Sequence, residues 1–142
     1  MKENMLQTAT KRLKASGYKL TTARLTILEV LCQHEDHLTS TELLTLVQER
    51  DETIGRASVF RTLDLLTELA IIRPTYLRPN TPHYIVMPES GHHAHIVCTQ
   101  CNQVTELDDC AVDGLLHDWG LRHNVEITGH VLELYGQCEQ CR

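Results

Sequence analysis

Two Cys-x-x-Cys pairs constrain the fold of this chain more than any other feature of its sequence. They are Cys98 with Cys101 and Cys138 with Cys141, separated by residues 102–137. Two residues between thiolates form a turn that presents both sulfurs to one tetrahedral ion, so the two pairs predict a four-cysteine zinc site. Such a closed shell leaves no position for water, and we expect the zinc to be structural. A redox dithiol is the alternative for either pair alone.

The composition is that of a soluble globular chain. It has 142 residues, 42% of them hydrophobic and 23% charged, which is enough for one ordinary domain or two small ones. No apolar run approaches the roughly 20 residues needed to span a bilayer, and the first residues do not resemble a signal peptide. We therefore expect a cytoplasmic protein without a membrane partner, whose cysteines bind metal rather than form disulfides.

Charge is distributed unevenly along the chain. Residues 1–80 hold 11 Lys+Arg against 10 Asp+Glu, a net +1, whereas residues 81–142 hold 2 against 9, a net −7; together they give the overall −6. A balanced first part and an acidic second part rich in His and Cys predict two domains, 1–80 and 81–142.

The first part has a helical period. It predicts helices over about 4–15, from Thr21 or Thr22, from the capping box that Thr39 and Glu42 form, and after Gly55. Short strands over 71–77 and 83–87 then flank a turn-rich link. This order predicts a winged helix, with a helical bundle and a stray hairpin as the alternative.

The second part has short strand patterns at 94–98 and 103–107, a short helix at 111–119 and one long strand at 124–135. The whole chain is therefore expected to be α+β. The remaining cysteines, Cys32 and Cys110, are expected to be small buried hydrophobic residues.

Histidines cluster at 92–95, in the run His92-His93-Ala94-His95. In an extended strand, His93 and His95 face one side while His92 faces the other. Two imidazoles on one face are half of a metal site, which His83 and His37 are candidates to complete. The H-E-x-x-H, G-x-S-x-G, P-loop and dinucleotide motifs do not occur, so we do not expect an enzyme.

The start of the fourth expected helix carries Arg56, Ser58, Arg61 and Thr62. Arginines and small hydroxyls at a helix start suit contacts with phosphates and base edges. The alternative is an ordinary solvated helix face.

Taken together, these segments resemble the ferric uptake regulator (Fur) family of metal-responsive repressors. The resemblance rests on five segments in order: 20–31, 37–43, 54–63, 92–101 and 130–138. It implies an N-terminal winged helix-turn-helix DNA-binding domain joined by a hinge to a small C-terminal α/β dimerisation domain. It also implies a homodimer that binds a palindromic operator in double-stranded DNA.

The resemblance also implies roles for individual residues. The four cysteines would hold structural zinc, and His37, His93 and His95 a regulatory ion. Lys19 would contact the minor groove and Arg61 would also contact DNA, with Arg24, Arg56, Ser58 and Phe60 as further candidates. Phe60 stands where the family usually has Tyr.

Two departures bear on the metals. The usual Glu or Cys ligand falls near Ile85, so His83 is the expected substitute, and four nitrogens without a carboxylate favour zinc over ferrous iron. This suggests the zinc-sensing branch; an iron-sensing repressor and a thiol or peroxide redox switch are the alternatives. A zinc hydrolase would need an open metal position and a general base. An extra site of His92, Asp113 and His130 would be weak, because Ala94 removes one ligand.

Overall fold

The structure is a computed structural model that describes residues 2–34, 37–78, 80–89, 92–107 and 111–142. The chain divides into two compact units, Met1–Met87 and Pro88–Arg142. The boundary expected after residue 80 therefore falls inside the last hairpin of the first unit. Cys110 lies outside the described residues. Within the described ranges, no helix combines the length and apolar character that a membrane span requires.

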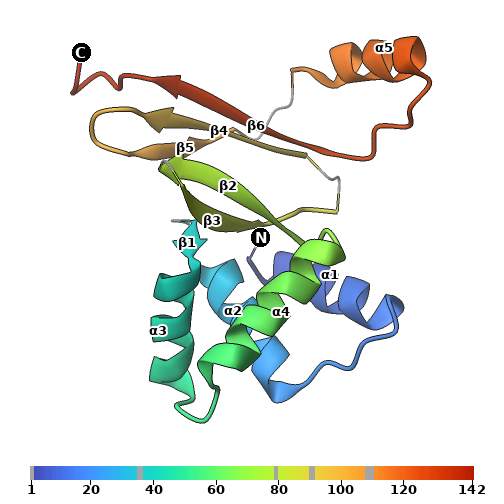
Figure 1. Ribbon diagram of the computed structural model, residues 1–142. Coiled ribbons are helices and arrows are strands. Elements are labelled where there is room, and N and C mark those ends of the chain that lie inside the picture. Colours follow the sequence, from blue (N-terminus) through green and yellow to red (C-terminus); the bar gives the residue numbers. More distant parts are fainter. Residues whose placement is uncertain (1, 35–36, 79, 90–91, 108–110) are drawn as a thin grey trace. The chain divides into compact units, whose positions relative to one another are not determined.

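The four expected helices of the first unit are present (Figure 1). They are α1 (Lys2–Ala15), α2 (Thr22–Gln33), α3 (Ser40–Arg50) and α4 (Arg56–Glu68). The capping box forms as predicted. The Glu42 backbone N–H donates to the Thr39 hydroxyl at 3.2 Å, and the Thr39 N–H donates to the Glu42 carboxylate at 2.9 Å. These bonds satisfy N–H groups that the first turn of α3 cannot pair within the helix.

The first unit also contains a three-stranded antiparallel sheet. Its strands are β1 (Leu38–Thr39), β2 (Ile72–Arg78) and β3 (Thr81–Val86), in the order β1-β3-β2. The β2–β3 hairpin after α4 completes the predicted winged helix. The sequence did not predict β1, because two residues are too few to show a strand period.

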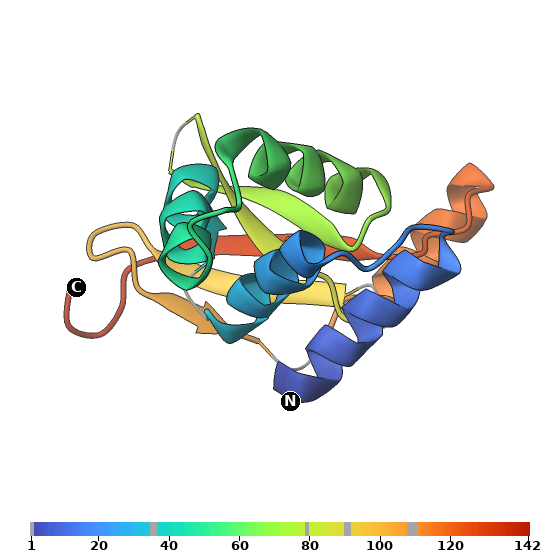
Figure 2. The same cartoon turned by 90° about the horizontal axis from the view of Figure 1, so that it is seen from below.

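The core of the first unit is built around α2, which contacts α1, α3, α4 and β3 (Figure 2). Helical spacing turns one apolar stripe of each helix inward, and burying each such side chain contributes about 1.5–3 kcal/mol. The fully buried members include Leu13, Ile27, Leu28, Val30, Leu43, Val47, Val59, Leu66, Ile71 and Ile72.

The second unit is smaller and has an α+β fold. It contains β4 (His92–Cys98), β5 (Val104–Glu106), α5 (Asp113–His123) and β6 (His130–Gly136). The strand order is β5-β4-β6, with β5 antiparallel and β6 parallel to β4. A parallel pair needs a long crossover, and the segment that contains α5 supplies it.

The expectation of one strand over 124–135 is wrong in its first half, because β6 begins only at His130. Asn124 ends α5 in the left-handed region, with φ 53°, and the Val125 N–H donates to the Gly120 carbonyl at 2.9 Å. The chain therefore turns back at the helix end. A Cβ on Gly120 would lie 2.8 Å from the Val125 carbonyl oxygen, so this turn requires glycine.

Candidate functional site

The strand register of the second unit joins the two cysteine pairs. Cys98 ends β4 opposite Gly136, two residues before Cys138. The four sulfurs lie within 4.8 Å of one another, and those of Cys101 and Cys138 are 3.8 Å apart. A tetrahedral ion with Zn–S bonds of about 2.3 Å spaces two sulfurs by about 3.8 Å. The cluster therefore fits zinc, and it contains the four cysteines that the sequence predicts for one site.

The protein environment of the four thiols is uneven. Backbone N–H groups of Cys101, Cys138 and Gln100 point at the Cys98 sulfur and lower the pKa of Cys98 to about 6. Hydrogen bonds with the thiols of Cys138 and then Cys101 raise the pKa of Cys141 to about 12. Four neighbouring thiolates repel one another, and a divalent cation is the group that stabilises all four together.

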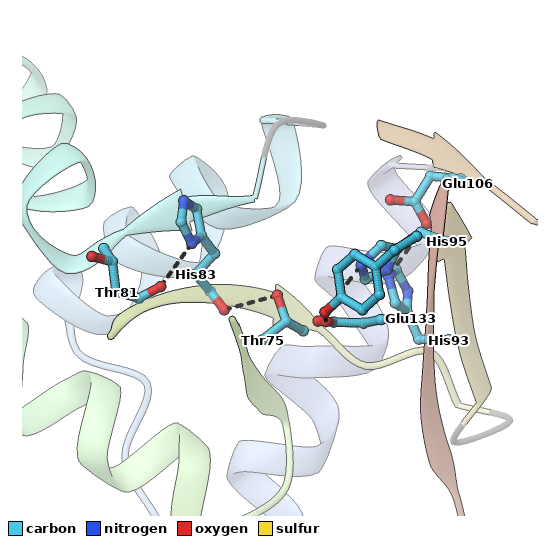
Figure 3. A network of polar contacts seen from close by, with 8 residues as sticks. Thr75, Thr81, His83, His93, His95, Glu106 and Glu133 are labelled. Carbon is cyan, nitrogen blue, oxygen red and sulfur yellow. Dashed lines mark hydrogen bonds and ion pairs between the residues drawn. The ribbon is translucent and has the colours of Figure 1, made fainter. Parts of the chain in front are cut away.

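A second cluster lies on one face of β4. His93 and His95 share this face as predicted, with ring centroids 5.1 Å apart. The His93 Nε2 lies 3.3 Å from a Glu106 carboxylate oxygen, and the His95 Nε2 lies 3.7 Å from one of Glu133 (Figure 3). His95 is fully buried. The donor atoms of His93, His95 and Glu106 lie within 4.8 Å of one another, which suits a divalent ion.

Sequence reasoning missed both carboxylates. Glu106 on β5 and Glu133 on β6 are the cross-strand partners of His95. The Cys98–Cys101 turn lies in the β4–β5 connection and sets the register of this hairpin. That register could have shown that Glu106 lies opposite His95. Glu133 depends on the parallel register of β6, which no local pattern reveals. The sequence interpretation considered only nitrogen donors here, and the structure adds an oxygen donor.

The other two expected ligands belong to the first unit. His37 directly precedes β1 and is partly buried, whereas His83 on β3 is buried. The His83 Nδ1 lies 3.0 Å from the Thr81 carbonyl oxygen, and the Thr75 hydroxyl donates to the His83 carbonyl at 3.5 Å (Figure 3). Ile85 is buried and apolar, as expected for a position that binds no metal.

The outer face of α4 carries the expected DNA-contacting side chains. Arg56 and Arg61 are exposed, and Ser58 and Phe60 are partly exposed. The Arg56 guanidinium lies over the Phe60 ring, 5.1 Å from its centroid, so the ring restricts that cation. Thr62 was grouped with these residues, but it is buried with the inner stripe of α4. Its position, six residues after Arg56, turns it toward the core.

The connection between α1 and α2 presents the exposed Lys19. Arg24 braces this segment, because its Nη1 donates to the Lys19 carbonyl at 2.6 Å and its backbone N–H donates to the Thr21 hydroxyl. Its guanidinium also lies 5.8 Å from the centroid of the Tyr18 ring. Arg24 is therefore engaged within the protein.

Cys32 behaves as the sequence predicts. It is buried in the core of the first unit, and this burial raises the pKa of its thiol to about 11.

A winged helix with an exposed basic helix face, followed by a four-cysteine site and a His–Glu cluster, defines a class of metal-binding DNA-binding proteins. The chain belongs to the ferric uptake regulator family, since the profile described as "Ferric uptake regulator family" matches residues 15–135. The ferric uptake regulation protein of Bacillus subtilis (strain 168) is 33% identical, over 98% of this chain and 95% of the relative. The resemblance is thereby confirmed.

Solved structures agree on the fold. The Vibrio cholerae ferric uptake regulator superposes with a TM-score of 0.65 at 32% identity, over 90% of this chain and 98% of that chain. A zinc-bound manganese uptake regulator gives a TM-score of 0.65 at 27% identity, over 92% and 98%. Members of the family are metal-responsive transcriptional regulators that bind DNA as dimers, so the chain is a transcriptional regulator and not an enzyme.

Proposed function

We propose that this protein is a zinc-responsive repressor, a homodimer that binds a palindromic DNA operator when a regulatory ion is present. The observation that carries this proposal is a pair of separate donor sets within the second unit. The four sulfurs make a closed structural shell, whereas His93, His95 and Glu106 supply nitrogen and oxygen donors suited to an ion that exchanges.

We propose that His37 and His83 of the first unit complete the regulatory set. Ligands from both units would couple metal binding to the arrangement of the units, because the ion shifts the equilibrium toward the form that it binds better. In a dimer this arrangement governs how two copies of α4 meet two half-sites. Half-sites one helical turn apart are separated by about 34–36 Å.

Zinc is the favoured regulatory ion. The set offers four imidazoles and one carboxylate, and four of these five donors suit a four-coordinate zinc ion. Ferrous iron is the second candidate, because a set with a carboxylate also suits iron, and because the Bacillus subtilis relative is named a ferric uptake regulation protein. Glu106 is thus the observation that favours the iron alternative.

The DNA contacts are proposed for the first unit. Lys19 would enter the minor groove, while Arg61, Ser58 and the Arg56–Phe60 stack on α4 would face the major groove. Their exposure and the charge of the three cations support this assignment. The second unit carries the acidic charge of the chain, and it would lie away from the phosphates.

The test is operator binding measured against free Zn²⁺ and, without oxygen, against free Fe²⁺. We expect zinc to induce binding in the parent protein and in His34→Ala, a control that removes an exposed histidine at the end of α2. His83→Ala is expected to abolish the zinc response while it keeps the four-cysteine zinc.

Two results would change the proposal. Activation by Fe²⁺ alone would overturn the zinc assignment in favour of the iron-sensing alternative. A normal zinc response in His83→Ala, combined with a lost response in Glu106→Gln, would replace His83 by Glu106 in the ligand set.

A further inference from the structure

The parallel register of β4 and β6 pairs two histidines of β4 with polar residues of β6. His92 pairs with His130, their Nδ1 atoms 2.8 Å apart, and the Asp113 Oδ1 lies 3.9 Å from the His92 Nδ1. These are the three residues of the extra site that the family resemblance implies. His95 points to the opposite face of β4 and pairs with Glu133, a residue to which the sequence interpretation gave no role.

Glu133 brings its carboxylate to a ring that is closed off from solvent. The His95 imidazole is fully buried, and its Nε2 lies 3.7 Å from the Glu133 Oε1 (Figure 3). The Glu133 side chain is itself only 17% exposed, so little solvent screens its charge from the ring. A separation of 3.7 Å exceeds a hydrogen bond of about 2.7–3.2 Å. An ion on the other ring nitrogen would make the Nε2–H a stronger donor and shorten this distance.

Tyr135 holds the other oxygen of the Glu133 carboxylate. The two residues share one face of β6, and the Tyr135 hydroxyl donates a hydrogen bond to the Glu133 Oε2. This hydrogen bond and burial of the hydroxyl raise the pKa of Tyr135, so the hydroxyl keeps its proton and remains a donor. With Oε2 engaged, Oε1 is the oxygen that faces His95.

The position of Glu133 differs from that of a metal ligand. The donor atoms of His93, His95 and Glu106 lie within 4.8 Å of one another, and Glu133 is not part of this group of described residues. A histidine that binds a metal through one ring nitrogen usually donates the other N–H to a carboxylate or a carbonyl. Such a partner fixes the tautomer and the ring orientation, and it makes the ligating nitrogen more basic.

We propose that Glu133 is a positioning residue of the regulatory site, which holds the His95 proton on Nε2 so that Nδ1 presents its lone pair to the ion. Tyr135 orients the Glu133 carboxylate for this role. The inference rests on the proposed regulatory site, but it does not depend on which ion that site senses. It assigns the two carboxylates that flank β4 different roles, since Glu106 lies among the donors and Glu133 acts through His95.

The first test reads the tautomer of His95 directly. Long-range ¹H–¹⁵N spectra of full-length protein with ¹⁵N-labelled histidine rings distinguish the two neutral forms, in protein that holds only the four-cysteine zinc. The spectrum of His95→Asn assigns the signal. We expect the parent to carry the proton on Nε2, Glu133→Ala to lose this preference, and Glu133→Gln to retain it, because the amide oxygen still accepts. Glu126→Ala, which removes an exposed carboxylate between α5 and β6, is the control and should match the parent.

The second test is a Co²⁺ titration of the same protein, followed by the visible absorption of the bound ion. The regulatory step is the one that His93→Ala loses. We expect Glu133→Ala to weaken this step by about tenfold or more, as the loss of such a hydrogen-bond partner does in other metal sites. Glu133→Gln and Tyr135→Phe should weaken it less, and Glu126→Ala should not change it. Retained four-cysteine zinc and unchanged circular dichroism would show that each variant folds.

Three results would overturn the inference. A parent-like tautomer and Co²⁺ affinity in Glu133→Ala, with the step still lost in His93→Ala, would refute the role of Glu133 and leave the regulatory site standing. An unchanged tautomer with an altered absorption spectrum of the bound Co²⁺ would make Glu133 a ligand instead. If no Co²⁺ step depends on His93, the proposed regulatory site fails together with the inference.

Discussion

The two units reach a stable fold by different means. The first buries a continuous apolar core contributed by all four of its helices and its sheet. In the second, the buried residues among those described are confined to β4, and α5 buries none. Many large apolar side chains of the second unit are exposed instead, among them Leu115, Trp119, Leu121, Val125, Ile127 and Leu134.

This difference gives a physical reason for the clusters of metal-donor side chains in the second unit. A small domain with little hydrophobic core can gain folding free energy from bound ions, as small zinc domains do. A second copy of the chain, as proposed for the dimer, would cover exposed apolar surface of this extent. The first unit buries its core without bound ions or a second copy of the chain. Its exposed Lys and Arg side chains are therefore available for the proposed DNA contacts.

Removing the structural zinc should have the largest effect on this comparison. Cys98→Ser and Cys138→Ser are each expected to release about one zinc per chain and to disrupt the dimer, since structural zinc contributes roughly 10–16 kcal/mol in small domains. Metal analysis and size-exclusion chromatography measure both. The control is Cys32→Ala, which changes the core of the first unit and should leave the zinc of the four-cysteine site in place. Full zinc and a normal dimer in both serine variants would contradict the assignment.

Truncating a core side chain should instead destabilise the first unit and leave the zinc of the second unit in place. Leu66→Ala leaves a cavity in the first unit and is expected to lower its free energy of unfolding by about 2–5 kcal/mol, with no loss of zinc. Leu121→Ala, at a position 70% exposed on α5, should leave the stability of the first unit unchanged. Denaturant titration followed by helical circular dichroism distinguishes them. Equal effects of the two variants would mean that the units do not fold separately.

The charge contrast between the units gives a smaller effect. Arg61→Ala is expected to weaken operator binding by about 1–3 kcal/mol if the side chain reads a base. Arg122→Ala removes the same charge from the second unit and should have no such effect. Fluorescence anisotropy at several salt concentrations measures both, and a phosphate contact would lower the salt slope by about 1. If Arg61→Ala binds the operator as tightly as the parent protein, Arg61 does not belong to the DNA interface.

The smallest expected effect concerns Arg24. Because its guanidinium holds the Lys19 carbonyl, we expect Arg24→Ala to weaken operator binding by about 1 kcal/mol through misplacement of Lys19. In a Lys19→Ala background the same change should have no further effect, which a double-mutant cycle measures. Additive losses would instead show that Arg24 contacts DNA directly, as the sequence comparison suggested.

Much of this structure could be predicted from the sequence, because it depends on local interactions. The helical period placed the four helices, the Thr39–Glu42 pair marked the start of α3, and strand alternation separated His93 and His95 from His92. The two-residue spacing within each cysteine pair predicted a turn that presents both sulfurs to one ion. Each of these features depends on residues within a few positions of one another, so the sequence alone determines it.

Only the tertiary structure decided which distant residues share a site. The parallel register of β4 and β6 brings Cys138 to Cys98 and His130 to His92. The left-handed Asn124 turn shortens β6 and sends the chain back at the end of α5, against the alternating pattern before His130. Glu106 reaches His93 because a hairpin register places it there. Pairing between strands joins residues far apart in the chain, and a strand period says which face a side chain occupies but not which partner it meets.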